Sequence, residues 1–119
     1  MTPRLMPGFK PWDVVKVPFP YTDRPVRQYR PALVVAAGKL EAAHGLLWVL
    51  MITSAANRGW ADDVLISNLK TAGLPAPSVI RCAKIATIEA SDAQRVGRLP
   101  GADQKKVVSI LTGLMPRVR

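Results

Sequence analysis

Short apolar runs separated by turn residues occupy most of the chain. Valine-rich and leucine-rich runs of this length, bounded by Gly and Pro, favour buried strands over helices. The strands predicted in this way are residues 13–17, 32–37, 46–53, 63–67, 78–82, 85–88 and 95–99. Repeated short strands at this spacing are typical of a small barrel or sandwich.

The segments between these strands carry most of the turn residues. Pro18 and Pro20 cannot donate to a central ladder, so the first strand is expected to stop before them. Residues 19–30 then form a loop, and residues 38–45 form the turn between the second and third strands. Pro75 and Pro77 make the entry to the strand at residues 78–82 rigid.

The C-terminal segment has a different period. Residues 102–114 place apolar side chains at helical spacing, and Asp103 lies near the expected N-terminus, where a carboxylate is favourable. The predicted apolar stripe of this helix consists of Val107, Val108, Ile110, Leu111 and Leu114.

Composition narrows the class of protein. At 119 residues, the chain is long enough for one packed domain but not for two. Because 49% of the residues are hydrophobic, a packed fold is expected rather than a disordered chain. The formal charge of +9 fits a polyanionic partner, either nucleic acid or an acidic protein, and by itself fits a basic soluble domain without such a partner about equally well. A single Cys, Cys82, permits no intrachain disulfide, and together with a single His it argues against a structural zinc site within one chain.

No targeting or membrane segment is visible in the sequence. The first eleven residues lack the apolar core of a secretory signal. The longest uninterrupted apolar run, residues 46–52, is far short of the roughly 20 residues that span a bilayer. Both observations predict a cytoplasmic protein without a membrane partner.

Two residues at strand ends carry candidate chemistry. Arg30 precedes Pro31 and should sit at the mouth of a strand, while Thr53 ends the apolar run 46–52. A guanidinium and a hydroxyl on adjacent strand ends suit a site that grips phosphate. Taken alone, the simpler interpretation is an arginine that solvates a turn and a threonine that caps a loop. The wider sequence context decides against that interpretation.

Several blocks occur in a characteristic order. They are Trp12-Asp13-Val14-Val15, Pro18-Phe19-Pro20-Tyr21-Thr22-Asp23, Arg30-Pro31-Ala32-Leu33-Val34-Val35, Ile52-Thr53-Ser54, Gly73-Leu74, Pro77-Ser78-Val79-Ile80-Arg81, Lys84-Ile85-Ala86-Thr87-Ile88 and Val96-Gly97-Arg98-Leu99. From about Trp12 to the C-terminus, this string resembles the PemK/MazF-like toxins of bacterial type II toxin–antitoxin modules.

The resemblance implies both a fold and an activity. The fold is that of the CcdB/MazF/Kid plasmid-maintenance toxins, a mainly β, small SH3-like barrel with a C-terminal helix. One toxin domain would cover residues 1–119, with an irregular N-terminal extension over residues 1–11. The implied protein is a homodimer that cleaves single-stranded RNA without metal or other cofactor, and a cognate acidic antitoxin neutralises it. The terminal helix and the apolar strands are expected to form the dimer contact.

The resemblance also assigns roles to residues. Arg30 matches the catalytic Arg of the Arg-Pro turn, and Thr53 matches the catalytic Thr that ends the Ile-Thr strand. The implied reaction is attack of the ribose 2′-OH on the adjacent phosphorus, giving a 2′,3′-cyclic phosphate and a 5′-OH. The general acid and base stay open: His44 is expected at the surface, and Asp23 is better explained as a turn former than as a replacement carboxylate.

The chain departs from one branch of the family. Kid/PemK toxins carry an Arg-x-Asp in the strand after the Ser-Val turn, with both residues implicated in catalysis. Here Arg81 keeps the arginine, and Ala83 replaces the carboxylate by a methyl group. Arg81 could bind phosphate or could pair with Asp62, Asp63 or Glu89 in a structural bridge; both alternatives stay open.

Basic and aromatic residues in two loops are the candidate RNA contacts, because unstacked bases stack on aromatic rings while arginines neutralise phosphates. The predicted RNA-binding residues are Arg24, Arg27, Tyr29, Ser54, Arg58 and Arg81. Ser54 could instead cap the following turn, which is the favoured interpretation. Tyr21, Tyr29 and Trp60 are expected at the surface, under RNA or antitoxin, whereas Trp12, Trp48 and Phe19 are expected in the core.

Three functions are compatible with the sequence. The first is an endoribonuclease toxin, the second a toxin of the same fold that poisons a protein such as DNA gyrase, and the third a non-cleaving module that binds RNA or antitoxin. Arg30 and Thr53 favour the first, because a gyrase poison has no use for a phosphate-activating pair.

Overall fold

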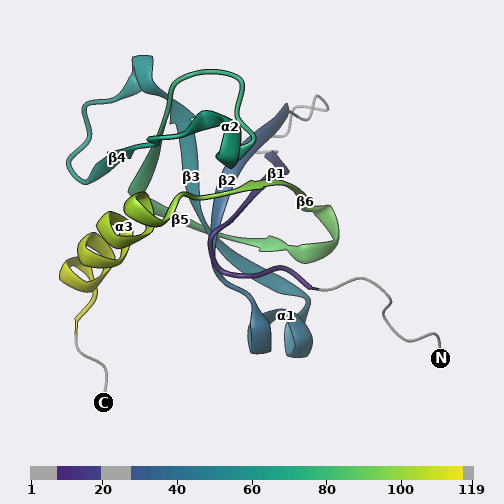
Figure 1. The fold of residues 1–119 in the computed structure, drawn as a ribbon. Coiled ribbons are helices and arrows are strands. Elements are labelled where there is room, and N and C mark those ends of the chain that lie inside the picture. The colour runs from purple at the N-terminus through teal and green to yellow at the C-terminus, as the bar shows by residue number, and fades with distance from the viewer. Residues whose placement is uncertain (1–7, 20–27, 117–119) are drawn as a thin grey trace.

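The computed structural model describes residues 8–19 and 28–116, which form a curled antiparallel sheet with helices at its ends and side (Figure 1). In chain order the elements are β1 (Asp13–Phe19), β2 (Gln28–Ala36), α1 (Gly38–His44), β3 (Leu46–Ser54), η1 (Ala55–Asn57), β4 (Asp63–Leu65), α2 (Leu69–Ala72), β5 (Ser78–Glu89), η2 (Ala90–Asp92), β6 (Gln94–Arg98) and α3 (Gly101–Leu114). The six strands lie in the order β4-β5-β3-β2-β1-β6. In the described part of the chain, no pairing joins β4 to β6, so the barrel-like sheet is open. The predicted mainly β architecture with a C-terminal helix is confirmed.

The central strands are buried on both faces of the sheet. Val14, Leu33 and Leu50 face one apolar cluster, which also contains Val107 of α3. The alternate residues of the same strands face a second cluster that is closed by the N-terminal segment and the second half of β5. Strands buried on two faces need apolar residues at every position, which explains the continuous apolar runs in the sequence.

The prediction that β1 stops before Pro18 was wrong. β1 continues through Pro18, which pairs with Tyr29 of β2. The pairing of β1 with β6 ends at Lys16, so Pro18 lies beyond the end of β6. Its missing N–H therefore interrupts no ladder on that side. The predicted loop over residues 19–30 was also too long, because β2 already begins at Gln28.

The structure contains a short helix, α1, where a turn was predicted, and another, α2, where no element was predicted. The connection between β2 and β3 is α1, and the left-handed Gly45 at its end donates its N–H to Glu41. Glu41 is buried and accepts a hydrogen bond of 2.9 Å from the N–H of Phe9. α2 follows Asn68, whose side chain accepts from the N–H of Thr71.

The two strands predicted at residues 78–82 and 85–88 are one strand, β5. Its register on β3 shifts where Leu50 pairs with Ile85 while the next residue, Met51, pairs with Arg81. Extra residues of β5 between those two partners form a bulge, which bends the strand without ending it. The bend lets β5 pair with β3 along both halves of its length.

Helix α3 begins at Gly101 and ends at Leu114, close to the prediction. Asp103 in its first turn is buried, and its Oδ2 accepts hydrogen bonds from the N–H and the hydroxyl of Ser67, at 2.9 and 3.0 Å. The predicted apolar stripe is correct for Val107, which is fully buried, but not for Val108 and Leu114, which are both 49% exposed.

The aromatic predictions divide in a similar way. Trp12 packs against the core, as expected, whereas Trp48 is 45% exposed, so the prediction that it fills the core was wrong. Tyr29 and Trp60 are exposed, as predicted. The side chain of Phe19, and the whole of Tyr21, lie outside what the structure describes. Within the described ranges, every helix is too short or too polar to cross a lipid bilayer.

Candidate active site

The ends of β2 and β3 that lie away from α1 carry Arg30 and Thr53. The register pairs Ala32 with Met51. Arg30 lies two residues before Ala32 on β2 and Thr53 two residues after Met51 on β3, just beyond this last pair. Side chains two residues apart along a strand share a face, so Arg30 and Thr53 lie on the same face as Ala32 and Met51. The two residues predicted to act together thus lie at the same end of neighbouring strands.

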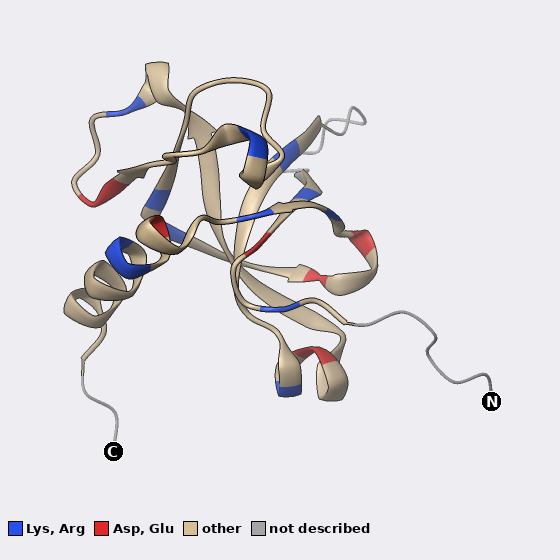
Figure 2. Ribbon diagram, in the orientation of Figure 1, with Lys and Arg blue, Asp and Glu red and all other residues tan. Residues whose placement is uncertain are grey.

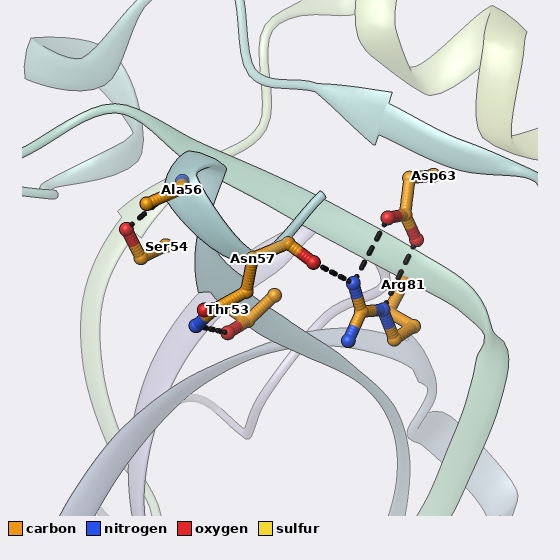
Figure 3. Close-up of polar contacts among 6 residues, drawn as sticks. All are labelled: Thr53, Ser54, Ala56, Asn57, Asp63 and Arg81. Atoms are coloured by element: carbon orange, nitrogen blue, oxygen red, sulfur yellow. Dashed lines mark hydrogen bonds and ion pairs between the residues drawn. The ribbon is translucent and has the colours of Figure 1, made fainter. Parts of the chain in front are cut away.

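The immediate surroundings of the two side chains differ. Arg30 is exposed, and its Nη2 donates a hydrogen bond of 3.2 Å to Oε1 of Gln28 on the same strand. Thr53 is half-buried, and its Oγ1 accepts a hydrogen bond of 3.2 Å from Nδ2 of Asn57 in η1 (Figure 3). This end of the sheet therefore offers an accessible guanidinium on β2 and, on β3, a hydroxyl that is already held in place.

Ser54 performs the capping role that the sequence favoured. Its Oγ accepts a hydrogen bond of 3.2 Å from the N–H of Ala56, at the start of η1 (Figure 3). η1 continues to Asn57, so this cap helps to define the turn that brings Asn57 back over Thr53. Arg58 follows directly and is exposed.

Arg81 is engaged in a structural bridge, one of the two alternatives left open by the sequence. Its Nε and Nη2 donate to the two carboxylate oxygens of Asp63, at 3.2 and 3.0 Å. Nη2 also donates to the backbone oxygen of Asn57 at 2.7 Å. The guanidinium carbon lies 4.2 Å from the centre of the Trp60 ring, a cation–π distance.

This bridge is largely shielded from solvent. The side chains of Arg81 and Asp63 are 12% and 8% exposed. The hydrogen bonds from Arg81 hold the pKa of Asp63 below its usual range, so the carboxylate is charged at neutral pH. The guanidinium thus has a charged partner within its own chain.

Two predicted RNA contacts fall outside the described residues, and two others stay predictions. Arg24, Arg27 and the turn residue Asp23 lie in the part of the chain that the structure does not describe. Tyr29 and Arg58 are exposed near the candidate site, and their role in RNA binding stays a prediction.

The structure separates His44 from the site. His44 ends α1, which joins β2 and β3 at the end opposite Arg30 and Thr53 (Figure 1). β3 spans nine residues, so its two ends lie roughly 25 Å apart. The side chain is exposed, as predicted, and is too far away to transfer a proton at Thr53 within the same subunit.

Neither Ala83 nor Cys82 adds reactive chemistry. Ala83 lies in the bulge of β5 and lines an apolar groove with residues of α3. The neighbouring Cys82 is buried, which raises the pKa of its thiol to about 11 and keeps it protonated. Among residues 8–19 and 28–116, no three His, Cys, Asp or Glu side chains are grouped so that they could hold a metal ion.

Positive charge is spread over many elements rather than gathered at the candidate site. Basic residues occur on β2, β5, α2, α3 and β6 alike (Figure 2). At the far edge of the sheet, Arg95 and Arg98 lie 3.2 and 3.7 Å from the buried carboxylate of Asp13. Among the described residues, the arginines predicted to act on RNA are Arg30, Arg58 and Arg81, and Arg81 is paired with Asp63.

Sequence reasoning missed Asn57 and the specific partner of Arg81. Asn57 carries no motif, and its contact with Thr53 depends on the shape of η1. Asp63 was one of three candidate partners, and the register of β4 on β5 selects it by placing Asp63 opposite Arg81.

A family comparison identifies the class of protein. Residues 10–115 match the model of the family described as PemK-like, MazF-like toxin of type II toxin–antitoxin system. The chain therefore belongs to this family, as the sequence blocks predicted. No curated protein matches the sequence significantly.

Solved structures of toxins share the fold. MazF of Deinococcus radiodurans superposes with a TM-score of 0.70 at 20% identity, covering 92% of this chain and 97% of that one. A MazE–MazF structure from the same organism gives 0.70 at 19% identity, with 97% and 100% covered. An endoribonuclease in complex with its cognate antitoxin, from a mycobacterial species, gives 0.69 at 16% identity, with 95% and 100% covered.

Proposed function

We propose that this toxin is an endoribonuclease that cleaves single-stranded RNA without a metal ion and that a cognate acidic antitoxin neutralises it. The observation that carries the proposal is that the register pairs Ala32 with Met51, so Arg30 and Thr53 lie two residues beyond this pair at the same end of neighbouring strands. Toxins of the same fold that are described as endoribonucleases, one of them bound to its antitoxin, support it.

The two residues suit a reaction in which the substrate supplies its own nucleophile. The 2′-oxygen loses its proton and bonds to the adjacent phosphorus, and the bond to the 5′-oxygen breaks. The 5′-oxygen takes up a proton, so the products are a 2′,3′-cyclic phosphate and a 5′-OH. Because the nucleophile is already attached to the substrate, proximity needs no metal. DNA lacks the 2′-OH and is not a substrate.

Arg30 and Thr53 have separate tasks in this reaction. Negative charge grows on the non-bridging phosphate oxygens as the 2′-oxygen attacks. The Arg30 guanidinium can hold two of these oxygens and stays charged at any relevant pH. The Thr53 hydroxyl donates a further hydrogen bond as that charge develops. Both groups act by stabilising the transition state.

The first prediction is that metal-free protein cuts RNA. Purified protein in excess EDTA should fragment total bacterial RNA, leave single-stranded DNA of matched sequence intact and produce cyclic phosphate ends. The control is an RNA oligonucleotide that the protein cleaves, made again with one 2′-deoxy sugar at the cut position. This version should resist cleavage. Cleavage that requires magnesium would contradict the mechanism. Intact RNA with inhibition of a protein such as gyrase would favour the alternative toxin activity.

An exposed apolar surface supports the proposed homodimer. Two adjoining cavities of about 310 and 290 Å³ share Ile85 and Met115 and run between β5 and the end of α3. Trp48, Ile85 and Met115 on this surface are 45%, 50% and 55% exposed. Clustered apolar side chains of this size are unusual on a monomer. A second copy that covers them would explain why Trp48 is absent from the core.

The second prediction tests this dimer face. Ile85→Asp should weaken dimerisation at least about tenfold, because the partner would bury an unpaired carboxylate. Leu65→Asp is the matched control, since Leu65 is similarly exposed, at 53%, but lies on β4, away from this surface. Sedimentation equilibrium at micromolar concentration measures both variants. A wild-type monomer, or equal effects of the two substitutions, would contradict the proposal.

A further inference from the structure

A continuous chain of polar contacts connects Asp63 to Thr53 (Figure 3). The carboxylate of Asp63 accepts two hydrogen bonds from Arg81. Arg81 in turn donates to the backbone oxygen of Asn57, and the Asn57 amide donates to Thr53. Each contact joins a different element: β4, β5, η1 and β3 meet at this point.

The direction of the last hydrogen bond matters for the chemistry of Thr53. A hydroxyl group has one hydrogen to donate and two lone pairs that accept. Because Nδ2 of Asn57 donates to Oγ1 at 3.2 Å, this bond occupies a lone pair and leaves the hydroxyl hydrogen for another acceptor. A phosphate oxygen in the proposed reaction is such an acceptor.

The position of Asn57 is itself fixed by Arg81. Asn57 ends η1, a turn of three residues that could not hold its side chain by its own stability. The 2.7 Å bond from Arg81 anchors the backbone oxygen of Asn57. Arg81 is held in turn by the carboxylate of Asp63 and by the Trp60 ring.

We propose that Asn57 is a positioning residue that keeps the Thr53 hydroxyl oriented as a hydrogen-bond donor toward the scissile phosphate, with the Arg81–Asp63 pair as its support. This inference rests on the proposed RNA cleavage. It assigns Arg81 a task through Asn57 rather than a direct contact with RNA. It also gives Arg81 a function in a chain in which Ala83 replaces the carboxylate of the Arg-x-Asp motif.

The test reverses the polarity of the hydrogen bond. In Asn57→Asp, the carboxylate can only accept, so it should capture the hydrogen of Thr53 and lower kcat about 100-fold, the scale of losing one such donor. Asn57→Ala merely frees the hydroxyl, so kcat should fall about tenfold with little change in KM. Asn68→Asp is the matched control: Oδ1 of Asn68 accepts from the N–H of Thr71, and a carboxylate preserves that bond. This variant should cleave at the wild-type rate.

A second substitution separates orientation from simple repulsion of RNA. In a Thr53→Ala background, Asn57→Asp should cost little further activity, because no hydroxyl remains to be captured. An equal loss in both backgrounds, or an Asn57→Asp variant as active as the wild type, would overturn the inference while leaving RNA cleavage intact.

The same hydrogen bond can be tested without activity. If the wild type proves not to cleave RNA, the proposed function fails, and urea unfolding of Thr53→Ala, Asn57→Ala and the double variant still tests the contact. The midpoint shifts of the single variants should sum to more than the shift of the double variant. Additive shifts would show that the two side chains are not coupled, and the inference would be wrong.

Discussion

Arg30→Ala is expected to lower the rate of metal-free RNA cleavage by at least about 100-fold, the scale of removing a group that stabilises charge in a transition state. The exposed guanidinium donates to Gln28, an exposed residue on its own strand, so its removal leaves Gln28 accessible to water. The variant should therefore fold normally, and the loss should appear in kcat. Single-turnover cleavage of one oligonucleotide by wild type and variant measures this.

Two further variants sharpen the Arg30 experiment. Arg30→Lys keeps the charge but loses the planar fork that holds two phosphate oxygens, so an intermediate loss of about tenfold is expected. Lys39→Ala removes one positive charge from α1, at the opposite end of β2, and should leave cleavage unchanged. If Arg30→Ala and Lys39→Ala behave alike, the guanidinium has no specific task and the proposed mechanism is wrong.

The strands could be predicted from the sequence because burial on both faces leaves continuous apolar runs. β3 was predicted within one residue of its observed end, since Leu46 to Ser54 combines such a run with Gly45 before it. The same reasoning misplaced Trp48. The sequence pattern does not distinguish an apolar side chain in the core of its own chain from one on the surface, where a second copy can cover it.

The connection between β2 and β3 shows a different difficulty. The glycines at positions 38 and 45 predicted a turn from the sequence. In the structure both do adopt positive φ, as turn residues do. The residues between them are enough for nearly two helical turns, and Glu41 is buried against Phe9 from a distant part of the chain. This tertiary contact stabilises α1, and it leaves no local signal.

The candidate site was predictable to the extent that it is built on strand ends. Pro31 indicated that Arg30 lies near the start of a strand, and the end of an apolar run indicated that Thr53 lies at the end of one. The partner of Arg81 depended on the pairing of β4 with β5, which residue types alone do not determine. Asn57 was invisible for a related reason, because its contact requires the η1 turn to fold back over β3.

The stability of the fold should depend strongly on the close approach between Gly73 and Gly97. A Cβ atom on Gly73 would collide with the backbone oxygen of Val96, and one on Gly97 would collide with the backbone of Ala72. The end of α2 and strand β6 thus pack with their backbones in direct contact. This packing gives a physical reason for glycine in the Gly73-Leu74 and Val96-Gly97 blocks.

Gly73→Ala should therefore lower the free energy of unfolding by about 3 kcal/mol or more, combining steric overlap with the left-handed backbone at φ +74°. Gly45→Ala is the matched control. Gly45 also ends a helix in the left-handed region, at φ +67°, but its Cβ would meet nothing within 4 Å. It should cost about 1 kcal/mol, the backbone contribution alone.

Urea unfolding followed by circular dichroism measures both variants, at matched protein concentrations because dimerisation adds stability. Equal losses at the two glycines would show that α2 and β6 do not pack this closely. A clearly larger loss at Gly73, or failure of that variant alone to fold, is the expected result.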